Sequence, residues 1–255
     1  LEEWGIPGVK IDFMDRSDQW MVGYYERVMK CAARHRLFVD MHGSYTPKGL
    51  CRTYPNLLTY EGVLGMEQGA RCKPENSNWL PFIRNAVGPM DFTPGSMFSA
   101  QPEDNRSTGA NPMGTGTRAY QMALYVVFES PLQMLADNPV LYRREHLCTE
   151  FLAAVPTTWD SLRVLRAACG REVVVARRKG DKWYVGGITN DRSYTTEIAL
   201  DFLPAGRTFT KTSFEDGVNA DLQATDYRKR VREVDASTVV KVEMVRNGGW
   251  AAVIE

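Results

Sequence analysis

The chain has 255 residues, 44% of them hydrophobic, and its 31 basic and 31 acidic side chains give a formal net charge of zero. That length is enough for one large domain or two smaller ones. Charge balance without a basic run gives no reason to expect nucleic acid or an anionic membrane as a partner, and no apolar stretch is long enough for a transmembrane helix.

The five cysteines are widely spaced and form no C-x-x-C pair, which argues against a disulfide scaffold and a zinc site. The sequence opens at Leu1 directly into a strand-like segment, without a leader. We therefore expect an excerpt of a longer protein, so a missing signal peptide says nothing about localisation.

Short apolar runs alternate with helical patterns in the first part of the chain. Strand-like runs lie at 9–13, 37–43 and 56–63. Between the first two, apolar residues at helical spacing predict a helix over about 18–36, with Ser17 as a candidate N-cap.

The alternation continues further along the chain. The sequence predicts a short helix at 79–87, a fourth strand within 88–97, a strong helix at 116–130, a fifth strand at 131–137 and a final helix over about 142–167. Strands that alternate with helices indicate parallel β/α architecture. Five such units cannot close an eight-stranded barrel, so we expect the second half of a (β/α)8 TIM barrel.

From about residue 171 the pattern changes to short alternating strands separated by G-D, N-D and N-G-G turns. This pattern is typical of an antiparallel β domain. The predicted division is a barrel half at 1–169 and a small antiparallel β-sandwich domain at 170–255.

Polar residues follow the predicted strands, at the end where a β/α barrel places its chemistry. These residues are Asp12, Asp15, His42, Glu61, Asp91 and Asp137. Lys10 and Asp12 lie two apart and so share one face of their strand, where Lys10 would favour the ionised form of Asp12. Two carboxylates on one barrel rim suit glycoside hydrolysis, and a nearby carboxylate together with partial burial would raise the pKa of Glu67 for an acid role.

Each of these residues also has a simpler interpretation. Asp12 could cap a loop, Lys10 and Asp12 could form a structural ion pair, and His42 could cap a strand. Glu61 and Glu67 could be solvated surface side chains. Pattern alone therefore predicts a β/α barrel enzyme with acid/base chemistry and no more.

Three stretches favour the functional interpretation of these residues over the simpler one: "GVKIDFMDRSDQ", "VDMHGSYTPKGLCRTYPNLLTYEGVLGMEQ" and "PLQMLADNP". Together they resemble glycoside hydrolase family 97, bacterial exo-acting α-glucosidases and α-galactosidases. The resemblance implies a three-part protein with an N-terminal β-sandwich, a catalytic barrel and a C-terminal antiparallel domain. The N-terminal β-sandwich and the first half of the barrel would lie outside this sequence, as partners of the residues present.

The resemblance also implies a mechanism and a substrate. Inverting members carry a glutamate after the histidine and lack the K-x-D aspartate, whereas this chain has Asp12 and Gly43. That combination implies a retaining exo-α-galactosidase acting on terminal α-galactosides. An α-glucosidase of the same family and a non-catalytic carbohydrate-binding barrel stay open as alternatives.

Carried over position by position, the resemblance makes Asp12 the nucleophile and Glu67 the acid/base. Glu61 would ligate a calcium ion, and Lys10 and His42 would contact sugar hydroxyls. A retaining pair predicts a carboxyl separation of about 5 Å. Family members are exported, which implies a periplasmic or secreted protein.

Overall fold

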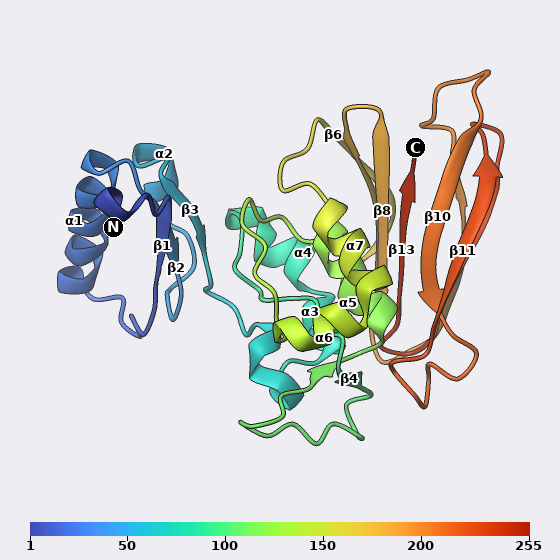
Figure 1. The fold of residues 1–255 in the computed structure, drawn as a ribbon, viewed down its shortest axis with the longest axis horizontal. Coiled ribbons are helices and arrows are strands. Elements are labelled where there is room, and N and C mark those ends of the chain that lie inside the picture. Colours follow the sequence, from blue (N-terminus) through green and yellow to red (C-terminus); the bar gives the residue numbers. More distant parts are fainter.

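The computed structural model describes all 255 residues as a small N-terminal lobe joined to a larger second lobe (Figure 1). The N-terminal lobe contains a parallel sheet of three strands in the order β1-β2-β3. The strands are β1 (Gly8–Ile11), β2 (Phe38–Met41) and β3 (Leu57–Tyr60). The first three predicted strands are therefore confirmed, each shorter than the apolar run that predicted it.

Helix α1 (Gln19–Arg34) covers one face of this sheet, as Figure 1 shows. Its N-cap is Asp18 rather than Ser17, and the Asp18 carboxylate accepts a hydrogen bond from the backbone N–H of Met21 at 3.1 Å. Residues at helical spacing turn inward and pack on the outer face of β1–β3. The buried α1 residues are Met21, Tyr25, Met29 and Ala32.

The predicted helix at 116–130 is confirmed as α5 (Arg118–Val127), with Thr117 as its N-cap. All of its residues are buried, as expected for a helix with neighbours on every side. It packs against strands of the C-terminal sheet. Shorter helical elements precede and follow it in the chain: α2 (Leu50–Thr53), η2 (Met66–Arg71), α3 (Pro74–Ser77), α4 (Leu80–Ile83), η3 (Asn85–Val87), α6 (Pro139–Arg144) and α7 (His146–Ala154).

Two predicted strands are wrong. The fourth is reduced to one parallel bridge between Tyr60 and Met90, and 131–137 forms no strand. In this last segment the Asp137 side chain replaces the backbone hydrogen bonds of a strand pair, because its carboxylate accepts from the backbone N–H groups of Met97 and Phe98. The remaining strands before the C-terminal sheet are the short pair β4 (Ser99–Ala100) and β5 (Gly114–Thr115).

The predicted helix over 142–167 is wrong in its second half. The last helix, α7, ends at Ala154, and β6 (Ser161–Ala168) follows. Pro156 explains the stop, since a proline disfavours the helical conformation of the residue before it. The antiparallel sheet therefore begins at Ser161, before the 168–170 boundary that the turn pattern predicts.

The predicted antiparallel C-terminal part is confirmed. Six strands pair in the order β11-β10-β13-β8-β7-β6, and β12 pairs with β9 in a separate two-stranded sheet. A buried apolar cluster that includes Trp250 and Val242 fills the space between the two sheets. The remaining strands are β7 (Glu172–Lys179), β8 (Lys182–Thr189), β9 (Tyr194–Ala199), β10 (Phe209–Asp216), β11 (Tyr227–Val234), β12 (Val239–Met244) and β13 (Gly249–Ile254). No helix of the chain is both long enough and apolar enough to cross a membrane.

Candidate active site

Each of the three parallel strands contributes two polar side chains, two positions apart, to the inner face of the sheet, opposite α1. Lys10 lies beside Asp40 in the strand register, and Asp40 lies beside Thr59. Because side chains alternate along a strand, the residue two positions later on each strand points to the same side. The second row, just past the strand ends, is Asp12, His42 and Glu61. This alternation brings the predicted site residues of β1, β2 and β3 to one end of one face.

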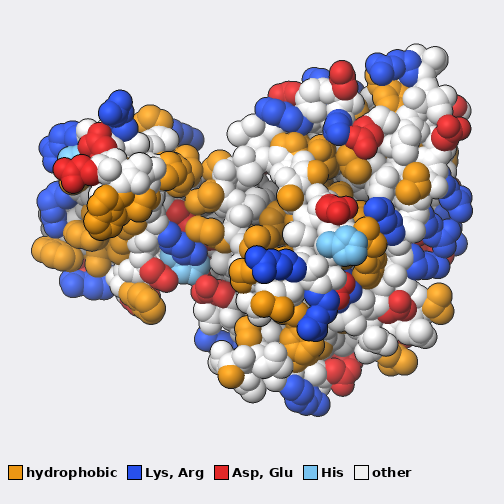
Figure 2. Space-filling view, viewed as in Figure 1, with side chains coloured by type: hydrophobic (Ala, Val, Ile, Leu, Met, Phe, Trp, Pro, Cys, Tyr) orange, Lys and Arg blue, Asp and Glu red, His pale blue; other side chains and the backbone are white.

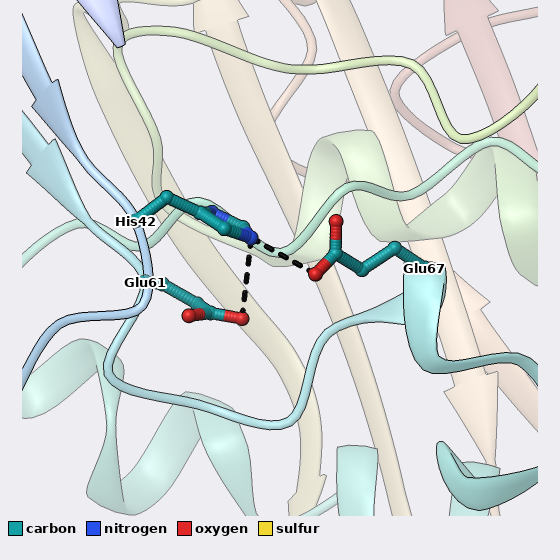
Figure 3. Close-up of side chains that lie close together, drawn as sticks. All are labelled: His42, Glu61 and Glu67. Atoms are coloured by element: carbon teal, nitrogen blue, oxygen red, sulfur yellow. Dashed lines mark hydrogen bonds and ion pairs between the residues drawn. The ribbon is translucent and has the colours of Figure 1, made fainter. Parts of the chain in front are cut away.

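His42 occupies the centre of the site, with its side chain 4% exposed (Figure 3). Its Nε2 lies 2.9 Å from Glu67 Oε1 and 3.4 Å from Glu61 Oε1, and its Nδ1 lies 2.8 Å from Asp91 Oδ2. Burial opposes a charge on the ring. The hydrogen bonds to Asp91 and Glu67 and the charge of Glu61 outweigh burial and raise the pKa of His42 to about 10. His42 is therefore an imidazolium that donates from both nitrogens.

Asp91 joins the residues of two strands. Its side chain is fully buried, and Oδ2 accepts from Lys10 Nζ at 2.7 Å as well as from His42. The simpler interpretation, a structural ion pair between Lys10 and Asp12, is therefore wrong, because Lys10 pairs with Asp91. Burial lowers the pKa of Lys10, but the hydrogen bond and charge of Asp91 outweigh it and raise that pKa. The Lys10 side chain therefore points toward Asp91 on the inner face of the sheet.

The two glutamates of the site have pKa values shifted in opposite directions. Burial raises the pKa of Glu61, whose Oε2 accepts from the backbone N–H of Gly43 at 2.8 Å. The pKa of Glu67 is lowered, chiefly by its hydrogen bond with His42, although burial acts against this. The prediction of a raised pKa for Glu67 is therefore wrong here, because the nearest group is a cation rather than a second carboxylate.

Asp12 follows β1 directly and lies against Gly43. Its Oδ1 accepts from the backbone N–H of Phe13 at 2.6 Å, and its side chain is exposed. A Cβ atom placed on Gly43 would lie 2.9 Å from that same oxygen, and Gly43 has a φ of +55°. Only glycine both adopts this backbone conformation readily and leaves room for the Asp12 carboxylate. A side chain at position 43 would therefore press on both the Asp12 carboxylate and the backbone of Phe13.

Asp40 is a site residue that the sequence interpretation missed. It is fully buried on the inner face. Burial, and then the charge of the neighbouring Asp91 carboxylate, raise the pKa of Asp40 to about 8. Its position two residues before His42, on the same strand face, repeats the Lys10–Asp12 spacing and was the available signal.

The donor atoms also suit a hard cation. Carboxylate oxygens of Glu61 and Glu67 lie within 4.8 Å of each other, beside His42. Asp12 adds a third carboxylate whose charge raises the pKa of Glu61. Carboxylate oxygens are what calcium prefers, and Glu61 has no lysine or arginine partner. The residues present therefore fit part of a calcium site.

The site lies where the two lobes meet. Lys10 and His42 belong to the small lobe, whereas Glu67 and Asp91 come from the chain that follows it. Figure 2 shows acidic, basic and histidine side chains gathered at this narrow junction. All five residues predicted from the sequence are thus found at one end of the parallel sheet.

Two curated relatives align with almost the whole chain. A protein named "Retaining alpha-galactosidase" from Bacteroides thetaiotaomicron is 43% identical over 99% of this chain and 39% of its own length. A "Probable retaining alpha-galactosidase" from Streptomyces bingchenggensis is 36% identical over 99% of this chain and 37% of its own. The chain therefore spans about two fifths of the length of these relatives.

Solved structures agree with this alignment. A glycoside hydrolase family 97 enzyme from Pseudoalteromonas sp. strain K8, in complex with acarbose, superposes with a TM-score of 0.83 and 37% identity over 93% of this chain and 37% of its own. A β-arabinopyranosidase superposes with a TM-score of 0.82 and 28% identity over 99% of this chain and 40% of its own.

Two family models match separate parts of the sequence. "Glycoside hydrolase 97" matches residues 1–63, and "Glycosyl-hydrolase 97 C-terminal, oligomerisation" matches residues 158–255. Together they cover both the strands that carry the site and the antiparallel sheets. The chain belongs to glycoside hydrolase family 97.

Proposed function

We propose that the whole protein carrying this chain is a retaining exo-α-galactosidase. The observation that carries the proposal is the exposed Asp12 carboxylate directly after β1, which lies beside a glycine rather than a base at position 43. The relatives at 43% and 36% identity that are named for this activity support it. The substrate would be a terminal α-galactoside.

The reaction would proceed by double displacement. A carboxylate oxygen of Asp12 attacks the anomeric carbon, the glycosidic C–O bond breaks, and Glu67 gives a proton to the departing oxygen. Glu67 holds this proton on its carboxyl group before the bond breaks, and His42 Nε2, 2.9 Å from Glu67 Oε1, fixes the position of that group. Glu67 then takes a proton from water, whose oxygen displaces Asp12 from the anomeric carbon. Two inversions give net retention.

Lys10 and His42 would bind sugar hydroxyls. His42 lies directly between Glu61 and Glu67, so a sugar that contacts Glu67 passes close to its ring. Lys10 keeps 29% of its side chain exposed while Asp91 holds its ammonium group. Both residues are cationic hydrogen-bond donors, which suits hydroxyl oxygens as acceptors.

Glu61 would hold a calcium ion in this protein. Its carboxylate accepts from the Gly43 N–H through Oε2, and Oε1, which lies 3.4 Å from His42 Nε2, would bind the ion. When bound, the ion would supply positive charge near the sugar and would offset the three carboxylates gathered there. Calcium takes six to eight oxygen ligands, so further ligands would come from elsewhere in the whole protein or from water.

The three parallel strands would form part of a (β/α)8 barrel in the whole protein. Strand β1 has a sheet neighbour on one side only, so its other edge is free to pair. Large apolar side chains near it are exposed, including Phe13 at 85% and Trp4 at 77%. The first half of the barrel and an N-terminal β-sandwich would cover this edge.

Azide rescue tests the nucleophile. Asp12→Gly in the whole protein should abolish turnover of 4-nitrophenyl α-galactoside, and added azide should restore it and give the β-galactosyl azide. Asp15→Gly is a matched control, because Asp15 is an exposed aspartate three residues further along the same loop. An unchanged rate in the Asp12 variant would refute the assignment.

Sugar preference is tested by a small panel of substrates. A β-L-arabinopyranoside presents the ring substituents of an α-D-galactoside without the exocyclic carbon, and a β-arabinopyranosidase is among the similar structures. We expect the highest kcat/KM on the 4-nitrophenyl α-galactoside, above the α-glucoside and the β-L-arabinopyranoside. Preference for the α-glucoside would favour the α-glucosidase alternative. Galactose binding without turnover of any of them would favour a non-catalytic barrel.

A further inference from the structure

Residues 91–93 form a buried segment that supports the site from behind. The segment follows Met90, which bridges to Tyr60 at the end of β3. All three of its residues are buried, so none of them lines the open part of the site. The Asp91 carboxylate contacts His42, and the Phe92 carbonyl accepts from the backbone N–H of Met66 at 2.8 Å.

Thr93 completes this support at Glu67. Its Oγ1 accepts a hydrogen bond from the backbone N–H of Glu67 at 3.0 Å. Glu67 lies in the first turn of η2, where backbone N–H groups have no partner within the helix. The Thr93 hydroxyl thus fixes the backbone from which the Glu67 carboxylate reaches His42.

The backbone of Thr93 is strained. Its φ is +54°, in the left-handed region, and a β-branched residue there is a genuine outlier. Glycine would adopt this conformation without that cost, but glycine has no hydroxyl. A strained residue that the surrounding structure holds in place beside a reactive group is typical of functional sites. The hydroxyl is what threonine adds at this position.

We propose that Thr93 is a positioning residue for Glu67. The strained backbone points the hydroxyl at the Glu67 N–H, and this bond sets the direction of the carboxylate toward His42 and the sugar oxygen. The inference rests on the proposed function, in which Glu67 is the acid/base. Thr93 itself touches neither substrate nor the reacting atoms.

Three variants of Thr93 in the whole protein separate the hydroxyl from the strain. Thr93→Val keeps the shape and removes the acceptor, Thr93→Ser keeps the acceptor, and Thr93→Gly removes both acceptor and strain. Thr238→Val is the matched control, because the Thr238 hydroxyl also accepts a backbone N–H at 3.0 Å, from Asp235, in the C-terminal sheets.

The leaving-group dependence is the kinetic readout. With an alkyl α-galactoside, Thr93→Val and Thr93→Gly should each lower kcat/KM, which reports the first displacement, by about 10- to 100-fold, the scale of a misplaced catalytic group. With 2,4-dinitrophenyl α-galactoside the loss in kcat/KM should be small, because that leaving group needs no proton. Thr93→Ser and Thr238→Val should match the unmodified protein. Equal losses on both substrates, or none, would overturn the inference.

Hydrogen exchange gives a second readout that needs no activity. Exchange at the Glu67 amide should be at least about tenfold faster in Thr93→Val and Thr93→Gly, and unchanged in Thr93→Ser. If the Glu67 amide of Thr93→Val exchanged as slowly as in the unmodified protein, the inference would be overturned, whichever substrate the protein hydrolyses. An unmodified protein that is inactive on all α-galactosides, but whose Glu67 amide responds as described, would overturn the proposed function and leave the Thr93 contact supported.

Discussion

A single methyl group at position 43 should displace the proposed nucleophile. In Gly43→Ala the new Cβ would lie 2.9 Å from Asp12 Oδ1, 2.9 Å from the Phe13 nitrogen and 3.1 Å from its Cα. Real Cβ contacts are essentially never shorter than 3.0 Å, and two of these three atoms belong to backbone. The loop that carries Asp12 must therefore move. Relief of these contacts needs a shift of only a few tenths of an ångström, so the loss in rate should be smaller than the 100-fold typical of a 1 Å misplacement, on the order of 10-fold.

The same substitution also strains the backbone, and this second effect can be measured separately. Gly43 has a φ of +55°, and an alanine in the left-handed region costs about 1–2 kcal/mol. Gly180, in the turn between β7 and β8, has a φ of +58° and no atom within 4 Å of an added Cβ. Gly180→Ala is thus a matched control that introduces the same strain without the contact.

The assay compares both variants in the whole protein. Urea unfolding should show a loss of about 1–2 kcal/mol for Gly180→Ala and at least as much for Gly43→Ala. Turnover of 4-nitrophenyl α-galactoside should fall about 10-fold in Gly43→Ala only. Full activity in Gly43→Ala would refute the reasoning, because Asp12 would then not depend on the space that the glycine leaves.

Three further outcomes follow from the contacts of the site. Glu61→Gln should weaken calcium binding by at least about tenfold, followed by terbium luminescence in competition with calcium, and unchanged affinity would exclude Glu61 as a ligand. Asp91→Asn removes a buried anion shared by Lys10 and His42, so the free energy of unfolding should fall by about 3–5 kcal/mol, and a loss below about 1 kcal/mol in urea unfolding would contradict that. The pKa of His42 is raised to about 10 from an unfolded value of about 6.5, so its charge stabilises the fold fully below about pH 6.5 and this contribution is lost as the pH rises through 10. In calcium-free buffer the free energy of unfolding should therefore fall between pH 7 and 10, and a His42→Gln variant with the same fall would contradict this account.

The sequence predicts the site better than it predicts the fold around it. The residues of β1, β2 and β3 follow a two-residue alternation, and any parallel sheet places such residues on one face. Lys10 and Asp12, however, are neighbours in that pattern and do not pair, because the ammonium group finds the buried Asp91 carboxylate instead. Which of several acids a flexible lysine meets depends on tertiary packing, which local spacing does not encode.

The wrong strand predictions have a similar cause. The segment 131–137 has the apolar character of a strand, but the Asp137 side chain takes the backbone donors of Met97 and Phe98 that a strand would otherwise have satisfied. Side-chain acceptors of this kind compete with regular pairing and leave no periodic signal. The helical pattern also predicts a final helix that runs past Pro156, whereas α7 ends at Ala154, two residues before this proline.

The pKa of Glu67 shows where pattern reasoning stops. Proximity to a second carboxylate predicts a raised pKa, but the His42 imidazolium lies 2.9 Å from Oε1 and lowers it. The direction of the shift depends on one contact between residues 25 positions apart in the chain. That contact in turn depends on the Asp91 carboxylate behind the ring, which only the fold brings there.

The stereochemistry of the first product tests the central claim most directly. Proton NMR can follow hydrolysis of 4-nitrophenyl α-galactoside by the whole protein and resolve the two anomers of galactose before they interconvert. Attack by Asp12 followed by water predicts that α-galactose appears first. Initial release of β-galactose would mean a single displacement by water, and Asp12 would then not be the nucleophile.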